Sequence, residues 1–446
     1  MADQHPPGPT GAPVLGSLPA ISRGMLDFMM DVATYGDVAS FTIGPTRNYL
    51  INHPKHIHDV LVARRDKFVK DPHDRRLLGR WMGHGLLTSE GQPHRRQRRL
   101  VQPAFRHRRM DGYGEIAVAA AERLIADWHA GDVRDMHREM MKLTLNVVSR
   151  SMFGRGVSDQ DALRVQRAVA GMQSVAIQLN KLGMLMSPRL LQPAHLLLRR
   201  GTRVLDSVVT RIIAERRQRP ADRGDLLSMF LLAQDEEDGA RMTDREVRDE
   251  CVTVFVAGQE TTANGLTWTW YLLSQHPDVA ERLVAELDEV LGDRPPTPED
   301  LPKLRYTEMV FNEALRIWPP AWTLNKRTPV EDVEVGGYRL CKGGGVFVMP
   351  YVMHHQERFF PDPYRFDPER FAPERLAAIE RYTFMPFGAG ERICIGSGFA
   401  MMEAKLILAT LAQRFRFSLA PGQKVRPNPL VTLAPKRGLR MRIHDR

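Results

Sequence analysis

The sequence predicts a mainly α-helical protein with small β-sheets, in which one long central helix passes through the interior. Most of the chain between residues 115 and 275 repeats apolar residues at spacings of three and four, as amphipathic helices do. Alternation typical of strands is confined to residues 38–51 and 333–349. The segment Asp244–Gln275 is unusually long and residues 252–257 are apolar on every face, so we expect this helix to be buried.

The two strand regions are bounded by turn residues. Val38, Ser40 and Thr42 alternate before a turn at Gly44-Pro45, and glycines at 336–337 and 343–345 separate the strands of consecutive hairpins. We expect these distant regions to pair in one small mixed sheet. Helices are expected at residues 115–128, 136–152, 159–179, 200–216, 244–275 and 399–415, and closing strands around residues 430–433 and 439–443.

The composition is that of an ordered globular protein. With 446 residues, 43% of them hydrophobic and 26% charged, the chain is neither disordered nor fibrous. It shows no repeat period and no internal linker, so we expect a single domain over residues 1–446 with a short proline-rich tail at 1–15. Because no apolar stretch reaches the roughly 18 residues of a membrane-spanning helix and no signal peptide is evident, we expect no membrane anchor.

The cysteines and the charge limit the possible environments and partners. Cys251, Cys341 and Cys394 cannot form a disulfide framework or a four-cysteine zinc site, and their scarcity predicts a cytoplasmic protein. The net charge of +10 is compatible with a nucleic acid, an acidic protein partner or a merely basic surface. Only 11 of the 63 basic residues are lysine. We interpret this preference for arginine over lysine as coding bias of a GC-rich bacterial genome, and we expect no nucleic-acid binding.

The most informative segment is a glycine-rich loop at residues 384–396, which precedes a helix and carries Cys394. The free N–H groups and positive dipole end of a helix N-terminus favour a thiolate and lower its pKa, which suits a metal ligand. A buried structural cysteine beside a glycine turn is the alternative. Phe387, Gly390, Arg392, Cys394 and Gly396 fit the spacing Phe-x-x-Gly-x-Arg-x-Cys-x-Gly, and in this the chain resembles the cytochrome P450 family.

The resemblance implies the cytochrome P450 fold, with the long helix crossing a haem b whose iron is bound by Cys394. Phe387 would shield the sulfur from water, and the loop glycines would let the backbone approach the porphyrin. Arginines and a histidine would bind the propionates, with His94-x-x-x-Arg98 in place of the family's usual Trp-x-x-x-Arg. The cofactor residues implied are Cys394 as the metal ligand and Arg392, Phe387, Gly388, Gly396, His94, Arg98, Arg327 and Ala257.

Residues 257–262 interrupt the apolar interior of the long helix with a carboxylate and two hydroxyls. Buried without partners, these groups would cost a few kcal/mol, so they must face a cavity or serve a purpose. The resemblance implies catalysis: Glu260 would relay solvent protons and Thr261 would stabilise the activated oxygen, while Ala257 and Gly258 would let the helix bulge. Threonines back-bonded within the helix and a solvent-facing glutamate are the alternative.

Glu313 and Arg316 lie three residues apart on one helix face, where an isolated ion pair would stabilise by only tenths of a kcal/mol. The resemblance adds Arg370, from Pro368-Glu369-Arg370-Phe371, as a third member. A buried charge network of these three would lock the cysteine loop against the helix, which is a structural role and not a catalytic one.

A basic segment runs from His94 to Arg109, where seven of sixteen residues are arginine. Since the resemblance implies electrons from a separate ferredoxin or flavodoxin with its NAD(P)H reductase, we expect Arg95, Arg96 and Arg99 to attract this acidic carrier. A solvated helix is the alternative. We expect the chain to act as a monomer.

The activity implied is that of a haem-thiolate monooxygenase, which inserts one atom of O2 into a lipophilic small molecule by hydroxylation or epoxidation. The chain looks most like bacterial terpene- and fatty-acid-oxidising members of natural-product biosynthesis. A peroxygenase, an isomerase or dehydratase, a polyketide-tailoring monooxygenase and a haem sensor are the alternatives. The expected pocket residues are Leu86, Val254, Ala321, Trp322, Leu324 and Leu433, within a largely apolar lining that also draws on residues 81–87, 172–186, 320–324 and 432.

Overall fold

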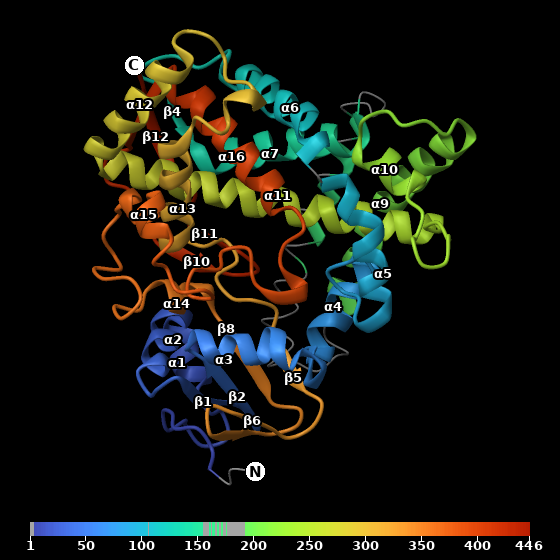
Figure 1. Cartoon of the computed structure of the whole chain (residues 1–446), viewed down its shortest axis with the longest axis vertical. Helices are drawn as coiled ribbons and strands as arrows, with labels where there is room; N and C mark the ends of the chain where they lie inside the picture. Colours follow the sequence, from blue (N-terminus) through green and yellow to red (C-terminus); the bar gives the residue numbers. More distant parts are fainter. Residues whose placement is uncertain are drawn as a thin grey trace.

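The computed structural model describes residues 4–105, 107–154, 160–161, 163–165, 167–168, 171–172, 175 and 192–446. The helix expected at 159–179 and the pocket segment expected at 172–186 lie largely outside these residues. Figure 1 shows a strand-rich part at the N-terminal end and a helix-rich part, with the long helix α11 (Asp244–Gln275) crossing the middle of the molecule. The predicted class, mainly α-helical with small sheets, is confirmed.

Helices make up most of the described structure. Besides α11, the α-helices are α1 (Leu18–Arg23), α2 (Met25–Ala33), α3 (Pro54–His58), α4 (Pro72–Met82), α5 (Gly91–Val101), α6 (His107–Ile125), α7 (Met136–Phe153), α9 (Gln192–Gln218), α10 (Leu226–Leu232), α12 (Pro277–Leu291), α13 (Arg305–Ile317), α14 (Pro350–His354), α15 (Pro373–Leu376) and α16 (Ser397–Ala412). The short turns are η1 (Asp59–Ala63), η2 (Arg65–Lys67), η3 (Gln102–Phe105), η5 (Pro298–Asp300), η6 (Pro368–Phe371) and η7 (Gly390–Arg392).

The strands form four small sheets. They are β1 (Val38–Ile43), β2 (Thr46–Ile51), β3 (Phe68–Lys70), β4 (Val133–Asp135), β5 (Arg327–Pro329), β6 (Val333–Val335), β7 (Tyr338–Leu340), β8 (Gly345–Val348), β9 (Phe415–Leu419), β10 (Pro427–Pro429), β11 (Leu433–Pro435) and β12 (Arg440–Asp445). The largest sheet has the order β1-β2-β8-β5-β3, and β2 pairs with β8 in parallel. The expected mixed sheet between the two distant strand regions is therefore confirmed.

Most of the predicted helix boundaries agree with the structure within a few residues. The expected helix at 115–128 begins earlier, at His107, and ends at Ile125. The closing strand expected around 430–433 is wrong, because residues 430–432 form the turn of the β10–β11 hairpin and only Leu433 belongs to a strand, as the first residue of β11. Three-residue strands are too short to show a period in the sequence, which explains the error.

The centre of α11 is buried by helices on several sides. It packs against α7, α13 and α16, and together with them it contributes to the largest hydrophobic cluster. A second cluster lies under the five-stranded sheet, and a third joins α2 to the β10–β11 hairpin. In the described part of the chain, no helix is long and apolar enough to cross a membrane.

The described part of the proline-rich tail is attached to the sheet. The Ser40 N–H donates to the Pro7 carbonyl and the Ser40 hydroxyl to the Pro6 carbonyl, each at 2.7 Å. A Cβ on Gly8 would meet the Ser40 carbonyl oxygen, so only glycine allows this close approach to β1.

Candidate functional site

The Cys394 loop lies between η7 and the N-terminus of α16. The Cys394 N–H donates to the Phe387 carbonyl at 2.9 Å, which closes the loop on itself. Gly390 has a φ of 70°, and a Cβ there would lie 2.5 Å from the Leu61 carbonyl oxygen, so this position requires glycine. Gly396, the N-cap of α16, has a φ of −92°, and a Cβ there would lie 4.0 Å from the Cys394 Sγ.

The surroundings of the Cys394 thiol do not lower its pKa, although the sequence predicts a lowered pKa for a cysteine at a helix N-terminus. Cys394 is solvent-accessible. Desolvation by the surrounding protein raises the pKa of its thiol, although the Gly396 N–H and the Arg98 charge act in the opposite direction. The helix N-terminus alone therefore does not lower the pKa as expected. A bound cation would supply the missing stabilisation of the thiolate.

Four residues expected to bind propionates lie in one cluster beside the loop, although three segments supply them. Arg98 donates to the Ile393 carbonyl at 2.9 Å, and Arg392 forms a 2.7 Å ion pair with Glu90. Desolvation lowers the pKa of His94 to about 3, and the pKa of Arg327 to about 10, with repulsion from Arg392 adding to both shifts. Mutual repulsion of buried cations means that anionic groups fit this cluster.

Sequence reasoning missed two members of this cluster. Lys70, at the end of β3, donates to the Leu87 carbonyl at 2.5 Å, and its backbone N–H donates to Glu90 at 3.1 Å. Desolvation lowers the pKa of Lys70 to about 7, and the charge of Arg392 adds to this. Neither residue belongs to a motif, so only the folded chain reveals them.

The charge network behind the loop has a fully buried centre. Arg316 binds Glu313 through two hydrogen bonds of 2.7 and 2.8 Å, and both side chains are 0% exposed. Arg370 adds an ion pair of 3.4 Å to Glu313. Arg316 also donates to the His354 carbonyl at 2.9 Å, and the His354 ring accepts the N–H of Met385 at 3.0 Å. His354, which the sequence did not indicate, thus connects the network to the start of the cysteine loop.

The carboxylate and hydroxyls of α11 are half-buried or buried. Thr261 donates to the Ala257 carbonyl at 2.6 Å, which is the back-bonded alternative. The expected bulge at Ala257 and Gly258 does not occur, because every residue of α11 is α-helical. Glu260 accepts a hydrogen bond from Thr432, in the turn between β10 and β11. Ala257 itself is exposed, and its expected contact with the cofactor stays a prediction.

The expected pocket residues fall into two groups. Leu86, Val254, Ala321 and Leu324 are partly exposed and remain available to a ligand. Trp322 and Leu433 are buried in the third hydrophobic cluster, at 7% and 0% exposed. Their contact with a substrate stays a prediction.

Of the three arginines of the basic segment expected to attract a carrier, two already form ion pairs within the chain. Arg96 forms a 2.7 Å ion pair with Glu246. Arg99 forms ion pairs of 3.2 and 2.8 Å with Asp235 and Glu237. The expectation that both attract a carrier therefore needs correction, since carboxylates of this chain already bind them. Arg95 is exposed.

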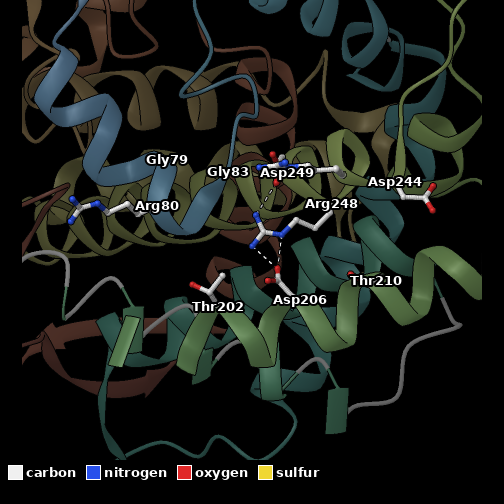
Figure 2. A pocket seen from close by; sticks show the side chains of 10 residues that line it. Gly79, Arg80, Gly83, Thr202, Asp206, Thr210, Asp244, Arg248 and Asp249 are labelled. Carbon is white, nitrogen blue, oxygen red and sulfur yellow. Dashed lines mark hydrogen bonds and ion pairs between the residues drawn. The ribbon is translucent and has the colours of Figure 1, made fainter. Parts of the chain in front are cut away.

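A cavity of about 440 Å³ lies between α4, α9 and the first turns of α11 (Figure 2). Arg248 joins its walls through ion pairs of 2.6 Å to Asp206 and 2.8 Å to Asp249. Its described lining is mainly charged and polar and, of the segments expected to line the substrate pocket, includes Gly83 from residues 81–87. We assign it no chemistry.

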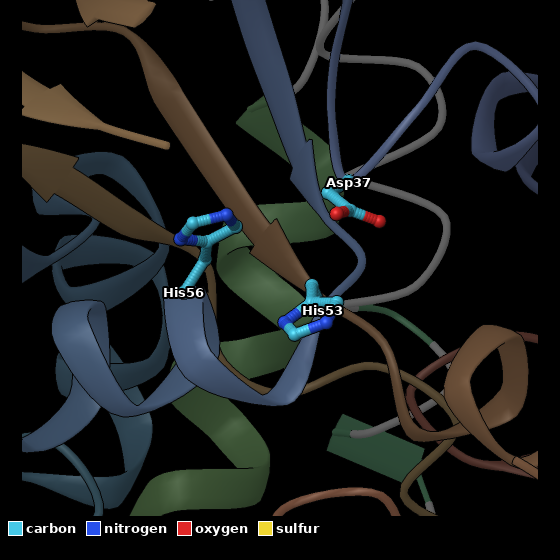
Figure 3. A group of neighbouring side chains, drawn as sticks. All are labelled: Asp37, His53 and His56. Atoms are coloured by element: carbon cyan, nitrogen blue, oxygen red, sulfur yellow. The ribbon is translucent and has the colours of Figure 1, made fainter. Parts of the chain in front are cut away.

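Among the described residues, Asp37, His53 and His56 place their ligand atoms within 4.8 Å of one another (Figure 3). Two of these residues are already engaged. Asp37 accepts a 2.7 Å hydrogen bond from Arg358, and the His53 Nδ1 accepts the Lys55 N–H at 3.2 Å. The group therefore serves the local structure at the start of α3.

Comparisons with known proteins agree with this geometry. The family model described as Cytochrome P450 matches residues 6–439. "Cyclooctatin synthase" of Streptomyces melanosporofaciens is 38% identical, over 96% of this chain and 94% of the relative. "Pentalenene oxygenase" of Streptomyces avermitilis is 37% identical, over 98% of this chain and 97% of the relative.

A third relative and a solved structure give the same result. "Cyclooctat-9-en-7-ol 5-monooxygenase" of Streptomyces melanosporofaciens is 38% identical, over 93% of this chain and 90% of the relative. The crystal structure of the cytochrome P450DA heme domain matches with a TM-score of 0.90 at 27% identity, covering 99% of this chain and 98% of that one. This chain therefore belongs to the cytochrome P450 family, as a monooxygenase whose cofactor is a haem-thiolate iron.

Proposed function

We propose that this cytochrome P450 hydroxylates or epoxidises a terpenoid hydrocarbon in bacterial natural-product biosynthesis. The observation that carries the proposal is the 37–38% identity, over nearly the whole chain, to relatives named for oxidising pentalenene and cyclooctat-9-en-7-ol. The partly exposed Leu86, Val254, Ala321 and Leu324 offer apolar surface suited to such a substrate. Fatty-acyl and polyketide substrates are the competing classes.

We infer that the cofactor is haem b. The residues that hold it would be those of the cysteine loop and of the cluster of basic side chains beside that loop. Cys394 would bind the iron, while Arg98, Arg327 and Arg392, with His94 and Lys70, would bind the propionates. The desolvation and mutual repulsion of these side chains support the assignment, since two carboxylates would relieve both. When bound, a thiolate-ligated haem supplies the activation of O2.

The proposed roles of the α11 residues concern protons. Glu260 would move solvent protons toward the place where O2 is activated. Thr261 would stabilise the activated oxygen through its hydroxyl. The Thr261 hydroxyl donates to the Ala257 carbonyl, so it can accept a further hydrogen bond through its lone pairs. A peroxygenase or isomerase would not need this pair, which distinguishes the alternatives by mutagenesis.

We propose that a separate acidic ferredoxin or flavodoxin, with its NAD(P)H reductase, supplies the electrons. The exposed Arg95 on α5 supports this docking, because Arg98 on the same helix reaches the backbone of the cysteine loop. We further propose that the chain is a monomeric single domain of the cytoplasm. The family match over residues 6–439 supports the single domain, and the free cysteines support the cytoplasmic location.

The substrate class is tested by a Soret-shift screen with pentalenene, lauric acid and a macrolide as probes. The shift in haem absorbance would report binding directly, whether or not electrons are available. The proposal predicts that pentalenene gives the largest shift and is converted to a product containing one added oxygen atom. A shift with lauric acid or the macrolide alone would move the assignment to the corresponding class.

A further inference from the structure

We propose that His137, Asn264 and Thr432 form a hydrogen-bonded chain that positions the carboxylate of Glu260. This inference rests on the proposed role of Glu260 in proton delivery. It adds three positioning residues, from α7, α11 and the β10–β11 turn, to the site.

The contacts are continuous from one end to the other. The His137 Nε2 lies 3.0 Å from the Asn264 Oδ1, and the Asn264 Nδ2 donates to the Thr432 hydroxyl at 2.9 Å. The Thr432 hydroxyl in turn donates to the Glu260 carboxylate. Asn264 is 0% and Thr432 6% exposed, so water competes little for these groups.

One chemical fact fixes the direction of every bond in this chain. A hydroxyl has a single proton, and Thr432 donates it to Glu260, so a lone pair of the Thr432 oxygen must face Asn264. The Asn264 atom facing Thr432 must therefore be its NH2 group, and its oxygen must face His137. His137 must then carry its proton on Nε2. Desolvation lowers the pKa of His137, which favours a neutral ring with one N–H at neutral pH.

The backbone around each member is fixed independently. The Leu433 carbonyl accepts from the Trp268 indole and the Leu433 N–H donates to the Pro320 carbonyl, both at 2.9 Å. These bonds hold the residue after Thr432 against α11. At the other end, the Asp135 carboxylate accepts the His137 N–H at 3.1 Å and caps α7. Asn264 follows Glu260 by four residues and lies on the same face of α11.

The hydrogen-bonded chain of His137, Asn264 and Thr432 orients Glu260. It does not itself conduct protons, because an amide cannot pass a proton along as a hydroxyl or imidazole can. Its effect is to hold the carboxylate in one position beside the β10–β11 turn. Removal of the Thr432 hydroxyl would leave this oxygen of Glu260 without that donor and would allow other rotamers. Proton delivery would then become less efficient, and reducing equivalents would be lost as hydrogen peroxide.

The test compares Thr432→Val, which has nearly the same shape but no hydroxyl, with Thr432→Ser, which keeps the hydroxyl. Coupling is measured as the amount of product formed per NADPH consumed. The substrate is the probe compound that the enzyme converts in the screen described above, which we expect to be pentalenene. We expect Thr432→Val to lower coupling about threefold or more and to release peroxide, while Thr432→Ser retains most of the wild-type coupling. The Soret band of the reduced carbon monoxide complex should be unchanged in both.

The Glu260→Gln background separates this inference from the role of Glu260 itself. If Glu260→Gln leaves coupling unchanged, the proposed proton delivery is wrong. If Glu260→Gln lowers coupling but Thr432→Val does not, the positioning chain is wrong. Thr432→Val should lower coupling little further in the Glu260→Gln background, because both changes impair the same proton-delivering carboxyl group. A full additional loss of coupling would contradict the proposed positioning role of Thr432.

A second readout needs no turnover. Histidine ¹⁵N spectra of the diamagnetic carbon monoxide complex report the tautomer of each ring, and His137→Gln identifies the signal of His137. The chain predicts the Nε2–H tautomer in the wild type and a changed signal in Asn264→Ala. An Nδ1–H tautomer in the wild type would overturn the proposed direction of the bonds.

Discussion

Several of the side chains beside the cysteine loop are cations whose charges repel one another, and Lys70 and Arg327 among them are buried. Lys70 shows the consequence most clearly, since desolvation lowers its pKa to about 7 and Arg392 adds to the effect. An anionic group bound at this position would restore the charged lysine and would take up a proton in doing so. The free energy of anion binding therefore depends on residues that no motif contains.

Lys70→Met tests this assignment, because methionine keeps the apolar stem and removes the charge. We expect haem to dissociate several-fold faster from the variant, since one propionate loses a partner, while the haem-free protein becomes no less stable. Haem transfer to apomyoglobin measures the rate. Lys67→Met is the matched control, because Lys67 lies three residues before Lys70 in the sequence, is partly exposed and forms an ion pair with Glu331. Equal dissociation rates for the wild type and Lys70→Met would exclude Lys70 from the haem site.

Thr261 lies where oxygen is expected to be activated. Thr261→Ala removes the hydroxyl and should leave haem and substrate binding intact, but NADPH consumption should exceed product formation several-fold. Thr267→Ala removes a similar hydroxyl-to-carbonyl bond, to Ala263, at a buried position farther along α11 and serves as the control. Unchanged coupling in Thr261→Ala would favour a reaction that needs no delivered proton.

At the scale of elements, α5 joins the cysteine loop to the surface. Arg98 binds the loop backbone, while Arg96 and Arg99 on the same helix bind Glu246, Asp235 and Glu237. These ion pairs engage two of the three arginines expected from the sequence to attract a partner. Arg95 remains the residue of this group best placed to attract an acidic electron carrier.

Arg95→Glu should slow reduction by the carrier and flatten its dependence on ionic strength, because surface charge acts mainly on the association rate. Substrate binding should not change. Stopped-flow reduction across a salt series measures both effects. The control is Arg23→Glu, which reverses an exposed charge on α1. If both variants behave alike, α5 is not the docking surface.

The elements show which parts of the structure can be read from the sequence. The predicted bounds of α11 agree with the structure because residues close in sequence determine both ends of the helix. Thr243 and Glu246 form a capping box at its start, and Pro277 follows its end. The cysteine loop is likewise a continuous motif. Lys70 and His354 could not be found in this way, since their partners come from distant segments. The sequence places Thr432 only in the expected pocket lining, and its hydrogen bond to Asn264, 168 positions away, could not be predicted.

For the whole molecule, burial of histidines makes stability depend on pH. Desolvation lowers the pKa of His355 to about 4, from an ordinary value near 6.5. The unfolded chain therefore binds more protons than the folded chain between about pH 6.5 and 4. Stability contributed by the neutral ring is present above pH 6.5 and is lost as the pH falls to 4, by about 3 kcal/mol.

Urea unfolding across this pH range measures the effect. The free energy of unfolding should fall on acidification in the wild type, with a smaller slope in His355→Gln. His73→Gln, at an exposed histidine, should keep the wild-type slope. Parallel slopes for all three proteins would mean that other groups cause the acid sensitivity.

The measurement that tests the account most directly is the absorbance of the reduced carbon monoxide complex. With Cys394 as the thiolate ligand, the wild type, Cys251→Ser and Cys341→Ser should all show a Soret band at about 450 nm, and Cys394→Ser should lose it. Retention of that band in Cys394→Ser, together with its loss in one of the other two variants, would contradict the assignment of the iron ligand and the site built around it.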